Sequence, residues 1–167
     1  MEKPKSRQQS AFEGLKTVLC SEQVLAYPNF GSQFILATDA SKVAVAAILS
    51  QVQDGVERPI SYALRRLNSA WRNNSASEAE MLAVTWGIRH YRCYLYGKRF
   101  VLRTDHAALR YLHNFADNNS RLLRWSLRLS EFDSTVEHRP GTQIRHAVAL
   151  SRAVQSIAHD MDLSREE

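Results

Sequence analysis

The sequence is poor in cysteine and has no long apolar run. Its two cysteines, Cys20 and Cys93, are too few for a disulfide framework or for the cysteine clusters of metal-binding knuckles. The longest apolar stretch, VAVAAIL at residues 43–49, has the length of a strand, whereas a membrane-spanning helix needs roughly 20 apolar residues. The N-terminal MEKPKSRQQS is polar and basic and lacks the apolar region of a secretory signal. We therefore expect an intracellular protein in reducing surroundings, with no membrane partner.

Charge is distributed unevenly along the chain. The 167 residues, a length that suits one domain with tails, carry 22 Lys and Arg against 17 Asp and Glu, a formal net charge of +5. From Ala153 onward, however, four acids accompany a single arginine, so the rest of the chain is more basic than the whole. Arginine matches the geometry of phosphate oxygens, which favours a polyanionic partner, although a solvated basic surface is the alternative interpretation.

Apolar runs and turn signals predict the strands. Three strands are expected at 33–39, 43–51 and about 57–63, and Asp54-Gly55 is typical of the hairpin turn between the second and the third. Two further strands are expected at 99–105 and 132–138.

Helical periodicity and capping signals predict the helices. The longest lies within residues 73–97, where Ser75 with Glu78, or Ser77 with Glu80, makes a capping box and Gly97 is a natural stop. Other helices are expected at 8–20, 107–113, 120–132 and 143–154. Three hairpin-connected strands followed by alternating helices and strands indicate an α/β fold. We expect a five-stranded mixed sheet, three strands antiparallel and then two parallel, with helices on both faces.

Two acids follow apolar strands in the same way. Asp39 ends the apolar run of FILATDAS (34–41), and Asp105 ends that of FVLRTDH (100–106). If the first and fourth strands are parallel neighbours, these acids face each other at one edge of the sheet, where Glu80 on the intervening helix can join them. Clustered carboxylates repel one another unless a cation binds, and hard oxygen ligands suit magnesium.

Each acid also has an ordinary explanation. A single aspartate after a strand is usually a turn or cap residue, and Glu80 has a capping role available. The repetition of the apolar-Thr-Asp phrase, with a glutamate on the helix between, favours the shared site.

A series of phrases follows along the chain: FILATDAS, AAILSQ, RPISYALRRLN, SEAEMLAV, RHYRCYLYG, FVLRTDHAAL, RWSLRLSEFDSTVEHRPG and ALSR. In this order they resemble the ribonuclease H domain of the reverse transcriptases of gypsy-type (Metaviridae) LTR retrotransposons, over about residues 11–152. Upstream, AFEGLK and VLAYPNF are similar to the segment that joins the polymerase to its nuclease.

The resemblance implies a fold, a substrate and a set of ligands. The family has the RNase H fold and is an endonuclease that cuts the RNA strand of RNA–DNA hybrids with Mg²⁺, or Mn²⁺, held by four acids. The first three acids correspond to Asp39, Glu80 and Asp105, and Glu80 rather than Glu78 is chosen because MLA follows it. His138 matches a family histidine that is thought to assist product release.

The fourth acid is missing. The family phrase Ala-Asp-Ala-Leu-Ser-Arg reads Ala-Val-Ala-Leu-Ser-Arg here, so that Val148 stands in the place of the aspartate. Valine offers no lone pair to a cation, and we expect the two-ion site to be reduced to one ion. Cleavage is then expected to be weak or absent. A domain retained for nucleic-acid binding or for subunit assembly is the alternative.

The remaining candidates concern binding. Arg121, Arg124 and Arg128 lie at helical spacing and form one ridge, which either follows a phosphate backbone or is a solvated face. We assign this ridge and Ser41 to nucleic-acid binding, and we assign Trp125 to the core.

The resemblance also divides the chain and names its partners. Residues 1–32 are expected to be a tail and the end of the connection segment, 33–154 the nuclease-like domain, and 155–167 a disordered acidic tail. The expected partners are an RNA–DNA hybrid, the polymerase domain of the same polyprotein and a second copy in a homodimer. The expected location is a cytoplasmic virus-like particle or the nucleus.

Overall fold

The computed structural model describes residues 10, 13–14, 17–18, 25–68, 71, 75–105 and 120–140, with the backbone alone at 120–122. In this part of the chain no helix is long and apolar enough to cross a membrane. The predicted helices at 107–113 and 143–154 lie outside the described residues, and in the one predicted at 8–20 the described residues are helical.

Five strands form one mixed sheet. They are β1 (Phe34–Ala40), β2 (Ala44–Gln53), β3 (Val56–Arg66), β4 (Phe100–Thr104) and β5 (Ser134–His138), in the spatial order β3-β2-β1-β4-β5. The first three pair antiparallel, whereas β4 pairs parallel with β1 and β5 parallel with β4. The predicted mixed sheet is thereby confirmed, with bounds that differ from the predicted ones by up to three residues.

The hairpin between β2 and β3 turns at the predicted residues. Asp54 and Gly55 have φ values of 54° and 77°, and positive φ at both central positions is the signature of a two-residue turn that matches the twist of the strands.

The predicted long helix is two helices. The capping box of Ser75 and Glu78 is present at the start of α3 (Ala76–His90), but this helix ends before Tyr91, and α4 (Arg92–Leu95) follows. Tyr91 has φ −98° and ψ 21°, is 2% exposed, and its hydroxyl lies 3.1 Å from the Ser61 Oγ on β3. The prediction of one continuous helix was therefore wrong, because the backbone leaves helical φ and ψ at this buried, hydrogen-bonded tyrosine.

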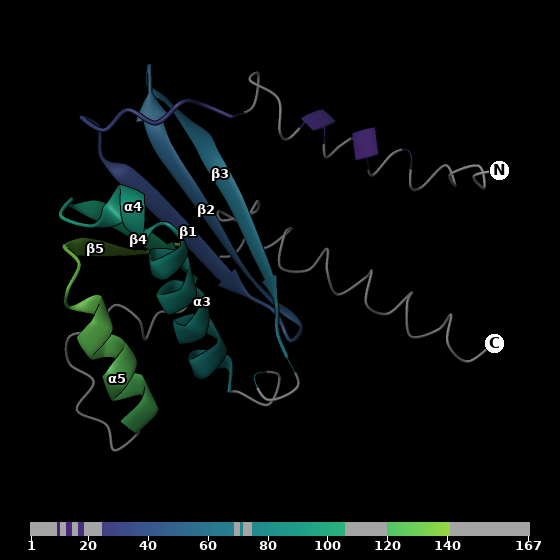
Figure 1. The fold of residues 1–167 in the computed structure, drawn as a ribbon, viewed down its shortest axis with the longest axis vertical. Coiled ribbons are helices and arrows are strands. Elements are labelled where there is room, and N and C mark those ends of the chain that lie inside the picture. The colour runs from purple at the N-terminus through teal and green to yellow at the C-terminus, as the bar shows by residue number, and fades with distance from the viewer. Residues whose placement is uncertain are drawn as a thin grey trace.

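Two of the described helices, α3 and α5, lie on one face of the sheet. α3 packs on β1 and β2, and α5 (Ser120–Leu129) packs beside α3 (Figure 1). One core unites them, in which apolar side chains of β1, β2 and β4 meet Met81, Val84, Ile88, Trp125 and Leu129. Trp125 is 7% exposed and stacks on Trp71, which agrees with its predicted place in the core.

The segment before β1 is held by one buried polar side chain. Gln51 in β2 is fully buried; its Nε2 donates to the carbonyl oxygens of Asn29 (2.7 Å) and Ser32 (2.9 Å), and its Oε1 accepts from the Asn29 N–H (2.9 Å). These bonds satisfy the amide completely and fix the segment beside the start of β1.

Candidate metal centre

Three carboxylates meet at one end of the sheet. Asp39 lies near the end of β1, Asp105 directly follows β4, and Glu80 lies in the second turn of α3. Each offers an oxygen, and the three oxygens lie within 4.8 Å of one another. The structure thus brings together the three acids that were selected from the sequence, although they are far apart along the chain.

Space between the acids arises because β1 and β4 stop pairing before these strands reach Asp39 and Asp105. The pairing of β1 with β4 stops at Ala37 and Arg103, whereas that of β1 with β2 continues to Ala40. Asp39 therefore lies on a strand that is held on one side and open on the other. Asp105 lies beyond the last β1–β4 pair, where the two strands no longer bond.

Glu80 is the most informative of the three acids. It is 8% exposed; its Oε1 accepts the Ala40 N–H at 3.2 Å, and its Oε2 has no hydrogen-bond partner among the described residues. Burial, followed by the charges of Asp105 and Asp39, raises the pKa of Glu80 to about 8 against the lowering effect of the Ala40 hydrogen bond. A buried oxygen without a partner beside two further carboxylates is what a hard divalent cation would satisfy, so the donor set fits Mg²⁺ or Mn²⁺.

His138 contacts the backbone of the centre. It pairs with Thr104 at the end of β5, and its Nε2 lies 2.9 Å from the carbonyl oxygen of Asp105. The tautomer protonated at Nε2 donates this hydrogen bond. The histidine thereby adjoins the metal centre without contributing to its carboxylate cluster, and its role in product release stays a prediction.

Ser41, a predicted nucleic-acid ligand, shapes the turn between β1 and β2. Its Oγ accepts the N–H of Ala44 at 3.0 Å and donates to the carbonyl oxygen of that residue at 3.1 Å. The hydroxyl therefore has a structural role beside the centre.

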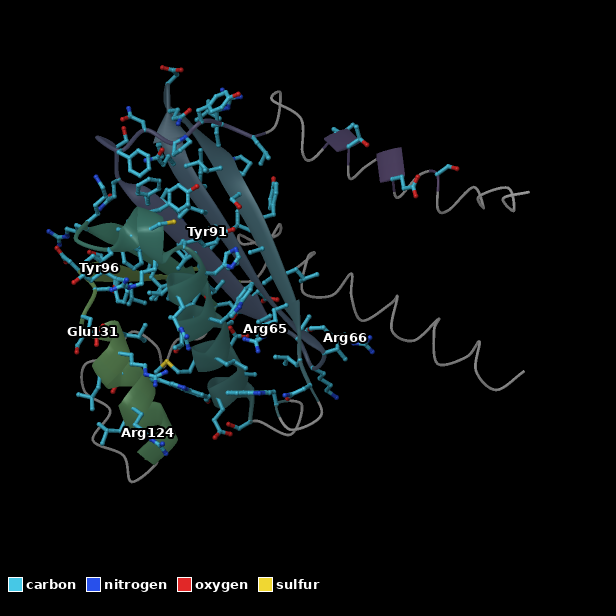
Figure 2. The ribbon with its side chains drawn as sticks, viewed as in Figure 1. Arg65, Arg66, Tyr91, Tyr96, Arg124 and Glu131 are labelled. Atoms are coloured by element: carbon cyan, nitrogen blue, oxygen red, sulfur yellow. The ribbon has the colours of Figure 1, made fainter. Side chains whose placement is uncertain are left out.

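Two of the three ridge arginines have described side chains. Arg124 and Arg128 are exposed on α5, whereas their neighbours Trp125 and Leu129 are buried, and Figure 2 shows Arg124 on this helix away from the strands. The Arg121 side chain and Val148 lie outside the described residues.

Sequence reasoning missed Arg103, the one charged residue within β4. Its guanidinium pairs with Glu57 of β3 at 2.5 Å and with Glu137 of β5 at 3.0 Å. The available signal was an arginine two positions before Asp105 in an otherwise uncharged strand.

The fold is that of ribonuclease H. A foamy-virus protease–reverse transcriptase solved with double-stranded DNA superposes with a TM-score of 0.65 at 14% identity, covering 82% of this chain and 26% of that one. LC11-RNase H1, isolated from compost by a metagenomic approach, superposes with a TM-score of 0.55 at 12% identity, covering 71% of this chain and 92% of that one. At such identities the likeness concerns the fold alone.

Sequence comparison identifies the family. Residues 29–132 match the family described as the RNase H-like domain found in reverse transcriptase, and the chain belongs to that family. It is 42% identical over 144 residues to the Pol polyprotein from transposon 412 of Drosophila melanogaster, covering 86% of this chain and 12% of the polyprotein. It is 39% identical over 152 residues to the transposon Tf2-3 polyprotein of Schizosaccharomyces pombe, covering 88% and 11% respectively. The predicted resemblance to retrotransposon reverse transcriptases is therefore confirmed, and the chain spans about an eighth of these relatives.

Proposed function

We propose that this domain is a metal-dependent endonuclease that cuts the RNA strand of RNA–DNA hybrids at a low rate. The observation that carries the proposal is that oxygens of Asp39, Glu80 and Asp105 lie within 4.8 Å of one another. One Glu80 oxygen is buried and has no hydrogen-bond partner in the described part of the chain. Membership of the reverse-transcriptase RNase H-like family supports the choice of substrate.

The residues of the site would have separate roles in cleavage. Asp39, Glu80 and Asp105 would hold the divalent ion, which, when bound, supplies charge stabilisation for the oxygens of a phosphodiester under attack. The Ala40 N–H orients Glu80, and His138 fixes the backbone of Asp105. Arg124 and Arg128 would hold phosphates of the hybrid on the exposed side of α5.

The low rate follows from Val148. The three remaining acids would hold one ion, whereas the missing carboxylate would be needed to hold a second. Loss of one metal-binding carboxylate commonly costs several kcal/mol of transition-state stabilisation, which is roughly a thousandfold or more in rate.

The partners follow from the family. We propose that the domain works within a polyprotein beside a polymerase domain, in a virus-like particle or in the nucleus. Two observations on similar proteins support this proposal: the matched relatives are transposon polyproteins, and one foamy-virus neighbour was solved with an RNA/DNA hybrid.

A labelled hybrid tests the proposal. With Mg²⁺ or Mn²⁺, we expect slow RNA cleavage that Asp105→Asn abolishes and that Val148→Asp increases. Wild-type turnover equal to that of an intact four-acid enzyme would refute the assigned impairment. Cleavage that survives Asp105→Asn would come from a contaminating nuclease.

The second candidate is a module that binds nucleic acid or a partner subunit without cutting, and the valine at position 148 is the observation that favours it. Hybrid binding in EDTA, together with no cleavage by either the wild type or Val148→Asp, would support this module over the nuclease.

A further inference from the structure

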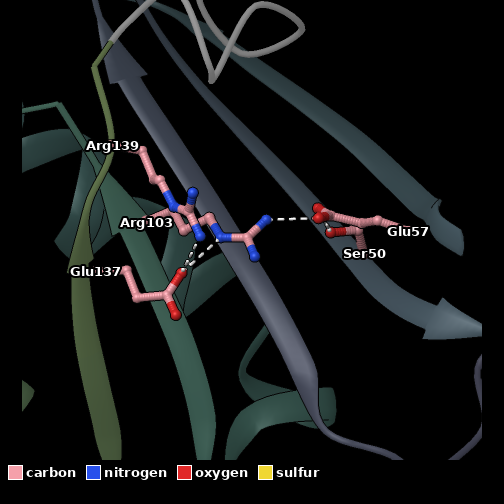
Figure 3. Close-up of polar contacts among 5 residues, drawn as sticks. All are labelled: Ser50, Glu57, Arg103, Glu137 and Arg139. Carbon is pink, nitrogen blue, oxygen red and sulfur yellow. Dashed lines mark hydrogen bonds and ion pairs between the residues drawn. The ribbon is translucent and has the colours of Figure 1, made fainter. Parts of the chain in front are cut away.

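Arg103 is the centre of an ion-pair network on the sheet face that carries Asp39. Its Nη1 lies 2.5 Å from Glu57 Oε2 and its Nε lies 3.0 Å from Glu137 Oε2. Arg139 also approaches Glu137, at 3.6 Å, and Ser50 donates to Glu57 at 2.8 Å. Figure 3 shows these five side chains together, with the Arg103 guanidinium reaching towards Glu57. The network joins β2, β3, β4 and β5.

The network spans β1 because β1 presents a small residue there. Arg103 is the parallel partner of Ala37, and the strand order places β1 and β2 between Arg103 and Glu57. The Arg103 side chain is 21% exposed. Burial raises the pKa of Glu57, but hydrogen bonds from Arg103 and Ser50 bring its pKa below the usual value. Both partners are thus charged, which strengthens their hydrogen bond.

Arg103 lies at the position where the pairing of β4 with β1 ends. The Ala37–Arg103 pair is the last between β1 and β4, and Asp105 follows two residues later, on the same face of the strand. Beyond this pair, β4 is held by β5: the Arg139 N–H donates to the Thr104 carbonyl at 3.0 Å, and His138 contacts the Asp105 carbonyl. Glu137, in the same stretch of β5, binds Arg103.

We propose that Arg103 is a positioning residue for the metal centre: its simultaneous pairing with Glu57 and Glu137 fixes the end of β4 across β1 and thereby holds the Asp105 carboxylate against Asp39 and Glu80. This inference rests on the metal site of the proposed function. Carboxylate ligands must be held to within about half an ångström for tight binding, and supports behind them commonly contribute tenfold or more to metal affinity.

Simple electrostatics predicts the opposite effect of removing Arg103. A positive charge near a cation site weakens binding, so its loss would strengthen cation binding if Arg103 acted only through its charge. Weaker binding after its removal is therefore the signature of positioning.

The test is Mn²⁺ titration of the purified protein by calorimetry, together with thermal unfolding in EDTA. Arg103→Met keeps much of the length of the side chain and removes the ion pairs, and we expect about tenfold weaker Mn²⁺ binding by molecules that remain folded. Arg103→Lys keeps the charge but loses the two-sided hydrogen bonding, and we expect an intermediate affinity.

Arg99→Met is the matched control. Arg99 immediately precedes β4, at the end of the strand away from the acids, and makes an exposed ion pair with Asp133 at 3.9 Å. Its loss should leave Mn²⁺ affinity unchanged.

The outcomes separate the two proposals. If the wild type binds Mn²⁺ and both Arg103 variants bind it equally or more tightly, the positioning role is overturned and the metal centre stays in place. Absence of Mn²⁺ binding by the wild type overturns the metal centre, and with it this role. If Arg103→Met does not fold, Arg103→Lys alone decides.

Discussion

At the scale of single residues, the burial of Glu80 sets it apart from an ordinary surface acid. Its carboxyl group is close to Asp39 and Asp105, and the residues that the structure describes give it one hydrogen bond, at Oε1. Without a cation, the folded state therefore resists its ionisation, whereas an unfolded chain ionises it freely. This difference makes the stability of the metal-free protein depend on pH.

We predict that the metal-free protein loses stability as pH rises. The folded pKa of Glu80 is raised to about 8 from 4.5, so its contribution is fully present below about pH 4.5 and is lost as pH rises through 8. The change is on the order of a few kcal/mol in the free energy of unfolding. Denaturant unfolding in EDTA at pH 5 and pH 8.5 measures it.

Glu80→Gln should remove most of this pH dependence, because glutamine does not ionise. Glu57→Gln is the contrasting variant: the pKa of Glu57 is lowered in the folded state, so its contribution is lost as pH falls rather than as it rises. An unchanged pH profile in Glu80→Gln would contradict the assignment.

At the scale of elements, α3 approaches the sheet closely through Gly87. A methyl group at this position would lie 3.1 Å from the Ala47 Cβ and 3.2 Å from the Thr38 Cγ2. Both neighbours are fully buried in the central strands β2 and β1, which have little room to move. The close contact keeps α3, and with it Glu80, near the strand that carries Asp39.

We predict that Gly87→Ala destabilises the domain. Overpacking costs about 1–3 kcal/mol, which exceeds the gain of about 0.5–1 kcal/mol from removing glycine from a helix. The midpoint of denaturant unfolding should fall, and adding Thr38→Ser, which removes one of the two contacts, should restore part of the loss. A stabilised Gly87→Ala variant would show that Ala47 and Thr38 shift enough to accommodate the added methyl group.

Local signals in the sequence predicted the local features of these elements. The capping box at Ser75 and the turn at Asp54-Gly55 depend on neighbouring residues, and both are present. The tyrosine at the helix break, Tyr91, binds Ser61, 30 residues away, and Arg103 pairs with Glu57, 46 residues away. No periodicity in the sequence reports such contacts, so both were missed.

The carboxylate cluster could be predicted from the sequence because the strand order of the sheet could be predicted. Once the first and fourth strands are taken as parallel neighbours, Asp39 and Asp105 must end at the same edge. The partnerless oxygen of Glu80 was not predictable, because it depends on the depth of α3 against β1.

At the scale of the whole molecule, the excess of basic side chains would give the proposed binding to nucleic acid a measurable dependence on salt. The formal charge is +5, and α5 presents the exposed Arg124 and Arg128 beside its buried face. Each phosphate that a protein neutralises adds roughly 0.9 to the slope of log affinity against log salt on duplex DNA.

We predict that Arg124→Glu lowers the magnitude of this slope by about one or more for an RNA–DNA hybrid. The affinity is measured by fluorescence anisotropy over roughly 50 to 200 mM salt, a range in which contacts to phosphates weaken strongly. Arg92→Glu, the same charge change on the exposed surface of α4, is the control and should have less effect. Equal slopes for the two variants would assign the arginines of α5 to solvent.

The attachment of Asn29 and Ser32 by Gln51 has a practical consequence for experiments with this domain. The polypeptide arrives beside Phe34, and Asp39 lies five residues further along β1, roughly 17 Å away at the rise of an extended strand. A purification tag, a surface anchor or a fluorescent protein joined directly before this segment would thus be attached at the end of the sheet opposite the carboxylates. Immobilising the protein through that side should leave the acidic rim open to an approaching duplex.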